Sequence, residues 1–163
     1  MDFQILHLIK TLHIQLVYKF KSSKFMTTIN EIMTKTVLTA KTDTPFEDVV
    51  NAMMNSKINH LPITNPDGSL RGIISASDVL QAIHELDKFA INYNGYSLEK
   101  RLDIKNEMSS DFISISINAD LNEAMDLLVS NNIHALPVVD DEYLVGILTS
   151  NDILRAIKKE GIF

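Results

Sequence analysis

Apolar side chains recur at helical spacing in two stretches of the chain. Each stretch places them at positions i, i+3, i+4, i+7 and i+8, from Phe46 to Met54 and from Leu121 to Val129. This spacing predicts two amphipathic helices, each with one face toward a core. The residues 44–47, Thr-Pro-Phe-Glu, add a capping box with proline at the first helical position. Asp120, followed three residues later by a glutamate, gives a looser form of the same start signal.

Short β-prone runs surround each of these helices. One run precedes the helix, and two more follow it as a predicted hairpin. Pro-Asp-Gly at 66–68 supplies turn chemistry in the first hairpin, and the acidic stretch 140–142 forms the loop of the second. The runs are residues 37–40, 61–64 and 71–75 around the first helix, and 112–115, 136–139 and 144–149 around the second.

A second helix is predicted to close each unit. Ser77 and Asn151 are its expected N-cap residues, because serine and asparagine favour that position. The closing helices are expected to bury their apolar positions, which are Val79, Leu80 and Ile83 in the first unit and Ile153, Leu154 and Ile157 in the second.

The two units are copies of one another, since residues 29–83 recur at 104–157 with an offset of 75 positions that becomes 74 after the first hairpin turn. At about 55 residues a lone copy is marginal, so the copies are expected to bury sheet surface together. The predicted fold class is α/β (α+β), with two β-α-β-β-α repeats packed as a pseudo-twofold pair. The expected divisions are an extension at 1–27, repeats at 28–83 and 103–158, a part-helical linker at 84–102 and a tail at 159–163.

Composition excludes several classes of protein. The 163 residues carry a net charge of −6, which disfavours a broad nucleic-acid surface. The absence of cysteine excludes disulfides and thiolate chemistry and is compatible with the cytoplasm, where we expect the protein to reside. Residues 1–25 carry +3, which leaves −9 for the rest, and their apolar runs are broken by Lys10 and Lys19. The apolar runs of this segment are too short to span a bilayer. The segment is either an amphipathic surface segment or an extension upstream of a protein that starts at Met26.

Two motifs occur in both copies. A Leu-Pro-hydrophobic strand, at 61–63 and 136–138, is followed by Gly-hydrophobic-hydrophobic-Ser/Thr-x-x-Asp, at 72–78 and 146–152. Over residues 28–158 this tandem pattern resembles a pair of cystathionine β-synthase (CBS) domains, known as a Bateman module. The resemblance implies two clefts that bind AMP, ADP, ATP or S-adenosylmethionine, no required metal, and a regulatory rather than catalytic role.

The motif residues also have their own chemistry. Gly72 and Gly146 lack a Cβ and would let a ligand or backbone come close to the strand. Ser75 and Thr149 stand just before a helix start, where free N–H groups favour a phosphate. The repeat-equivalent aspartates are acceptors suited to a ribose diol, the role that the resemblance implies. All these residues also suit helix capping or tight packing, and that alternative stays open. The candidate ligand-binding residues are Ile58, His60, Gly72, Ser75, Ser77, Asp78, Ile133, His134, Gly146, Thr149, Asn151 and Asp152.

Where nucleotide-regulated relatives hold phosphate-binding His and Arg together, this chain has Asn-His at 59–60 and His-Ala at 134–135, without arginine. Lys35, Arg71 and Arg155 could compensate, although nothing in the sequence places them in a cleft. A monophosphate or nucleoside-like ligand is therefore favoured. The five histidines have no metal-ligand spacing, so we expect no metal site.

These observations favour a stand-alone regulatory module that binds an adenosine-containing ligand and signals by a change of conformation or assembly. The alternative is a structural, partner-binding module with empty clefts. An enzyme is disfavoured, because the chain lacks a cysteine nucleophile, a phosphate-binding loop and a catalytic triad pattern. A homodimer is expected, because the helical stripes exceed what two short sheets can cover. A separate, unidentified regulated protein is the other expected partner, because no effector domain fits in the residues outside the repeats.

Overall fold

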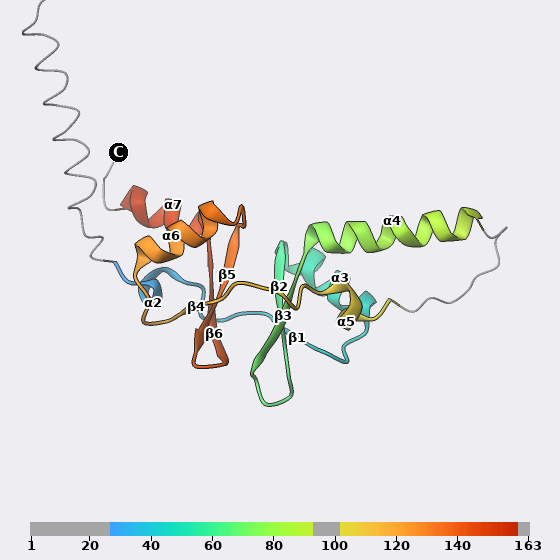
Figure 1. Ribbon diagram of the computed structural model, residues 1–163, viewed down its shortest axis with the longest axis horizontal. Coiled ribbons are helices and arrows are strands. Elements are labelled where there is room, and N and C mark those ends of the chain that lie inside the picture. Colours follow the sequence, from blue (N-terminus) through green and yellow to red (C-terminus); the bar gives the residue numbers. More distant parts are fainter. Residues whose placement is uncertain (1–26, 93–101, 160–163) are drawn as a thin grey trace, which may run out of the picture.

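Two three-stranded sheets stand side by side in the computed structural model, which describes residues 27–92 and 102–159 (Figure 1). In each sheet a short first strand pairs in parallel with the middle strand, which pairs antiparallel with the third as a hairpin. Each sheet belongs to one copy, so the predicted pair of repeats is confirmed. The strands are β1 (Ala40–Lys41), β2 (His60–Thr64) and β3 (Leu70–Ser75), then β4 (Ile115–Ser116), β5 (Ala135–Asp140) and β6 (Tyr143–Thr149).

The first strand of each sheet is shorter and lies later than the runs at 37–40 and 112–115 predict. Only the last residue of each run reaches the middle strand: Ala40 pairs with Ile63, and Ile115 pairs with Val138. The residue after each run forms the second pair of the ladder. The preceding residues 37–39 lie outside this ladder, and two of them line the cleft described below.

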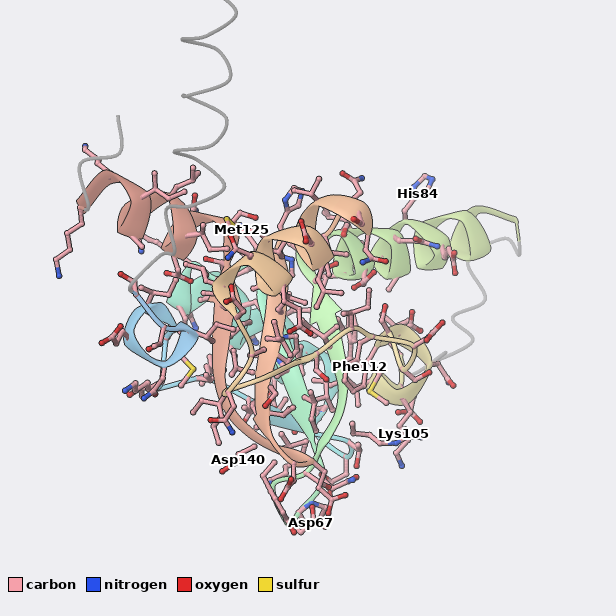
Figure 2. All side chains as sticks on the ribbon, turned by 60° about the vertical axis from the view of Figure 1, so that its left-hand side comes forward. Asp67, His84, Lys105, Phe112, Met125 and Asp140 are labelled. Carbon is pink, nitrogen blue, oxygen red and sulfur yellow. The ribbon has the colours of Figure 1, made fainter. Side chains whose placement is uncertain are left out.

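Four longer helices cover the sheets at one end of the molecule, opposite the hairpin tips (Figure 1). Figure 2 shows Asp67 and Asp140 at the hairpin end. The helices that follow the first strand of each copy are α3 (Phe46–Ser56) and α6 (Leu121–Ser130); the closing helices are α4 (Ala76–Asn92) and α7 (Ser150–Lys159). The part of the expected linker up to Asn92 is therefore helical, while residues 93–101 lie outside the described part of the chain.

The helix starts follow the sequence signals only in part. Asp120 is the N-cap of α6 and accepts a hydrogen bond from the Asn122 N–H at 2.7 Å, as expected. The capping box expected for α3 is wrong, because Pro45 takes the N-cap position. The Thr44 hydroxyl instead accepts the Lys41 N–H at 2.9 Å, which ties the turn before the helix.

The closing helices begin one or two residues earlier than expected. Ser77 and Asn151 lie within the first turn of α4 and α7, so their prediction as N-caps is wrong. Ser75 and Thr149 hold the capping position, because the aspartate three residues later accepts the N–H of each.

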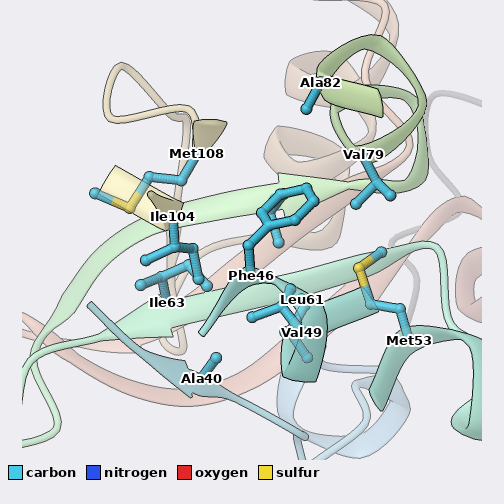
Figure 3. Packing of buried hydrophobic residues seen from close by; sticks show 11 residues of the cluster. Ala40, Phe46, Val49, Met53, Leu61, Ile63, Val79, Ala82, Ile104 and Met108 are labelled. Atoms are coloured by element: carbon cyan, nitrogen blue, oxygen red, sulfur yellow. The ribbon is translucent and has the colours of Figure 1, made fainter. Parts of the chain in front are cut away.

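The two copies exchange one short helix each. In α2 (Ile29–Ile32), Ile29 is fully buried in the core of the second copy. In α5 (Ile104–Glu107), Ile104 is buried in the core of the first, together with Met108 (Figure 3). Backbone hydrogen bonds fix both exchanges, and they link Thr34 with Ile147 at 2.9 and 3.0 Å and Ser109 with Ile73 at 2.9 and 3.1 Å. Neither core is complete without residues of the other copy.

The closing helices bury less apolar surface than the sequence predicts. Val79 and Ile153 are buried, whereas Leu80 is 68% and Leu154 60% exposed, and Ile83 is 41% exposed. The prediction that these three residues are buried is wrong, because each helix meets its sheet along one narrow face.

Candidate functional site: a cleft between the two copies

A cleft of about 770 Å³ opens between the two copies. Its walls come from three places: the chain at 34 and 36–38, which leads into β1; the end of α3 with the start of β2, at 56–60; and the start of α7, at 149–152 with Arg155. The first two belong to the first copy and the third to the second. Ser75, Ala76, Ser77, His134 and Ile147 complete the lining. A ligand bound here would contact both copies.

One part of the cleft is apolar. Val37 and Ile58 are half-buried there, and Ile147 of β6 is buried. The Thr34 carbonyl accepts the Ile147 N–H at 3.0 Å, so the exchanged first segment forms part of this wall. An apolar lining with nearby backbone groups suits a flat heteroaromatic ring.

At the start of α7, Asp152 is held by the helix cap. Its Oδ2 accepts hydrogen bonds from the Thr149 N–H at 2.9 Å and from the Thr149 hydroxyl at 2.6 Å. Its Oδ1 lies 3.6 Å from Arg155 Nη1. The carboxylate thus caps the helix with one oxygen while the other lies near an exposed guanidinium, so capping and ligand binding are compatible at this residue.

The equivalent cap at α4 has the same geometry. Asp78 Oδ2 accepts from both the N–H and the hydroxyl of Ser75 at 2.7 Å. Asp78 does not line the cleft, although Ser75 and Ser77 do, and the two serine hydroxyls are 2.7 Å apart.

The two glycines of the motif face methionines rather than the cleft. A Cβ on Gly72 would lie 2.7 Å from the Met108 sulfur and 2.9 Å from the Ser109 carbonyl oxygen. A Cβ on Gly146 would overlap the side chain of Met33. The missing side chains therefore make room for the segments that the two copies exchange.

Two histidines from different copies line the cleft. His60 is half-buried at the start of β2, and burial lowers its pKa. The nearby His134 lowers the pKa of His60 further, while the Asp78 carboxylate opposes both effects. His134 is exposed, and its carbonyl oxygen accepts the Ser150 N–H at 3.1 Å, which joins it to the start of α7. The neutral imidazole of His60 is therefore favoured in the absence of a bound anion.

The cleft brings together eight of the twelve candidate residues. Gly72, Asp78, Ile133 and Gly146 lie outside its lining. The eight that line it are Ile58, His60, Ser75, Ser77, His134, Thr149, Asn151 and Asp152.

Sequence reasoning missed one cation and left another unplaced. Lys57 lines the cleft from the C-cap of α3, where its backbone takes a left-handed conformation with φ of 52°. Arg155 lines it from α7, whereas Lys35 and Arg71 do not. The signal for Lys57 was its position directly before Ile58, in a segment already singled out.

No helix within residues 27–92 and 102–159 is long and apolar enough to cross a membrane. In the same residues, no three histidine or acidic side chains are grouped closely enough to hold a metal ion.

Comparisons with known proteins agree with this architecture. An uncharacterised protein of Methanocaldococcus jannaschii is 32% identical over 152 residues, which cover 79% of this chain and 90% of the relative. The inosine-5′-monophosphate dehydrogenase of the same organism is 31% identical over 130 residues, but the chain spans only 23% of that enzyme.

Two solved structures share the fold at high coverage. CBSX2 in complex with AMP has a TM-score of 0.69 and 26% identity, covering 82% of this chain and 98% of that one. The CBS domain pair of protein MJ0100, in complex with 5′-methylthioadenosine and S-adenosyl-L-methionine, has a TM-score of 0.67 and 27% identity, with the same coverage. The CBS domain matches residues 29–85 and again residues 102–159, so the chain belongs to the CBS domain family as a tandem pair.

Proposed function

We propose that this protein is a regulatory CBS pair, without catalytic activity of its own, that binds an adenosine-containing ligand in the cleft between its copies. AMP, ADP, ATP and S-adenosylmethionine are the candidate ligands. Binding is proposed to change the conformation or the assembly of the protein and so to act on a separate regulated protein in the cytoplasm.

The observation that carries this proposal is the composition of the cleft. It combines an apolar wall at Val37 and Ile58 with the start of α7, where the first-turn N–H groups and the Thr149 hydroxyl are close to the Asp152 carboxylate. An adenine ring suits the apolar wall, a ribose diol suits the carboxylate, and a phosphate suits the N–H groups of the helix start. The ligands present in the CBSX2 and MJ0100 structures, AMP and S-adenosyl compounds, support the same chemical class.

The same cleft offers a route for a signal. The hydrogen bonds between Thr34 and Ile147 join the first segment of one copy to the third strand of the other, and both residues line the cleft. A ligand that prefers one arrangement of this junction would shift the relative position of the copies, whereas equal affinity for both arrangements would shift nothing.

We also propose that the protein is a homodimer that associates through its helical end. Met54 and Val129 are repeat-equivalent and are 72% and 81% exposed, and Leu80 and Leu154 form a second equivalent pair. An apolar face with internal pseudo-twofold symmetry matches the requirement of an isologous interface, in which one patch meets a copy of itself.

The alternative, an assembly module with empty clefts, keeps one specific observation in its favour. Ser75, Asp78, Thr149 and Asp152 already satisfy one another as helix caps, so their presence is explained without a ligand. The two functions differ in whether the cleft binds a nucleotide.

Calorimetric titration of the full chain with the four candidate ligands separates them. We expect saturable binding of at least one ligand, and a loss of that binding in Asp152→Ala but not in Asp78→Ala, since only Asp152 lines the cleft. Asp152→Asn, which keeps an acceptor for the cap, is the control for folding. If nothing binds up to millimolar concentration in folded protein, the assembly function is correct instead.

A further inference from the structure

The cations of this acidic chain are distributed unequally over two repeat-equivalent positions. Lys57 and Arg155 line the cleft, where Asp152 is the single carboxylate, so two positive charges face one negative charge. The chain as a whole carries −6. The cleft is therefore a positively charged place on a negatively charged protein.

The pseudo-twofold axis relates the cleft to a second position on the protein. There, each structural element comes from the copy that does not supply it in the cleft. The junction of Ser109 with Ile73 takes the place of that between Thr34 and Ile147. Here Asn132 takes the place of Lys57, Ala135 that of His60, and Gln81 that of Arg155. Asp111 takes the place of Thr36, and Asp78 takes the place of Asp152. The second position thus has two carboxylates and no lysine or arginine among these equivalents.

The two cations are available to a ligand. Lys57 is exposed, and within the described residues its ammonium group has no hydrogen bond or ion pair. The Arg155 side chain is 79% exposed and makes one long ion pair, at 3.6 Å, with Asp152. Half-buried His60 lies in the same lining, where burial and then His134 lower its pKa and the Asp78 carboxylate raises it. A bound anion would raise this pKa further and so favour the protonated imidazole.

We propose that the cleft at Lys57 and Arg155 is phosphate-selective, and that these two residues select a phosphorylated adenosine there, whereas the repeat-equivalent position excludes phosphorylated ligands. This inference rests on the proposed function, because it assigns a charge class to the ligand of the cleft. The physical reason is that an exposed pair of cations attracts a phosphate dianion, while two aspartates repel it.

Paired titrations with AMP and with uncharged adenosine test the inference on the full chain. We expect AMP to bind at one molecule per chain, with an affinity that falls as salt is added. Lys57→Gln and Arg155→Gln should each weaken AMP by about tenfold, the scale of a lost charge-assisted hydrogen bond, and change adenosine binding less than about twofold. Lys158→Gln, which removes the same charge from the exposed face of the same helix, is the matched control and should leave both ligands unaffected.

A gain of function provides the second arm. Gln81→Arg combined with Asn132→Lys installs the cation pair at the second position and should raise the AMP stoichiometry from one to two per chain. All the substituted side chains are exposed, so melting curves should match the wild type.

The outcomes separate the two proposals. If adenosine and AMP bind equally and neither glutamine variant affects AMP, the charge assignment is overturned while the adenosine-binding function stands. The assignment is also overturned if the wild type binds two AMP molecules per chain. If neither ligand binds, the inference is overturned, and the titrations with ADP, ATP and S-adenosylmethionine decide whether the proposed function stands.

Discussion

The sulfur of Met108, from the second copy, occupies the place that a side chain on Gly72 of the first copy would need, since a Cβ there would lie 2.7 Å away. Met33 and Gly146 repeat this relationship in the other direction. Each motif glycine thus makes room for the segment that the other copy contributes. The close approach that a glycine permits is made by this protein segment.

Gly72→Ala is expected to destabilise the fold by about 1–3 kcal/mol, the range for overpacking a filled core. Gly146→Ala should cost less, because its new methyl meets only the flexible Met33 side chain, whereas the methyl at 72 also meets the Ser109 carbonyl oxygen. Urea unfolding of both variants measures the difference. In double-mutant cycles, Met33→Ala should reduce the destabilisation caused by Gly146→Ala more than Met108→Ala reduces that caused by Gly72→Ala. Equal destabilisation by the two alanines, with no coupling to either methionine, would contradict this packing.

Thr149→Ala and Ser75→Ala should each lower the free energy of unfolding by about 0.5–2 kcal/mol, because each removes a hydroxyl that the cap aspartate accepts. The two variants should differ in their effect on binding of the proposed ligand. Both hydroxyls line the cleft, but only the Thr149 cap belongs to the helix that carries Asp152 and Arg155, so Thr149→Ala should weaken AMP more than Ser75→Ala does. Calorimetry on variants of matched stability checks this, and equal effects on AMP would contradict a special role of the α7 cap.

The pKa of His60 gives the stability a pH dependence. Burial, and then His134, lower this pKa in the folded state below its usual value of 6.5, so the unfolded chain binds a proton more readily. The contribution of His60 to stability is fully present above pH 6.5 and is lost as the pH falls through the pKa of His60 in the folded state. We expect urea midpoints to fall below pH 6.5 in the wild type and to fall less in His60→Gln. His134→Gln should raise the His60 pKa, as read from the NMR titration of its imidazole; an unchanged value would remove His134 as a cause.

Much of this architecture could be predicted from the sequence because the pattern occurs twice. The hairpins and amphipathic helices follow from local periodicity, and Asp120 caps its helix as expected. The exchange of α2 and α5 could not be predicted, since one turn of helix with Ile29 looks the same whichever core receives it. The exposure of Leu80 was missed for a related reason, because helical spacing shows an apolar stripe but not how wide a face the sheet covers.

The lining of the cleft could be predicted where a capping motif lies at the cleft and less well elsewhere. Asp152 and Thr149 were found because the motif that caps α7 also stands at the cleft. Lys57 was missed because its place in the lining depends on the left-handed turn that ends α3. Lysine seldom adopts this conformation, so the residue type does not predict it. Its repeat equivalent, Asn132, has the same φ of 52° and no charge, and this difference distinguishes the two positions.

Ligand binding should protect the junction of the two copies against hydrogen exchange. The Thr34 amide donates to the Ile147 carbonyl oxygen at 2.9 Å, and both residues line the cleft, so a bound ligand should slow the exchange of these amides. The equivalent amides of Ser109 and Ile73 lie outside the cleft lining and should change less. Exchange measured with and without AMP tests this, and equal protection of both junctions would point to global stabilisation instead.

The exposed apolar pairs at the helical end predict the route of self-association. Leu80→Gln combined with Leu154→Gln should convert the proposed dimer to a monomer in sedimentation equilibrium, because both substitutions remove exposed apolar area from the proposed interface. Their exposure means that the monomer's own stability should change by less than about 0.5 kcal/mol per substitution. Tyr143→Gln is the matched control and should leave the dimer intact, because Tyr143 is 47% exposed and pairs with Asp140 at the tip of the β5–β6 hairpin. A dimer that survives the double substitution but dissociates in the tyrosine variant would place the interface at the hairpin tips.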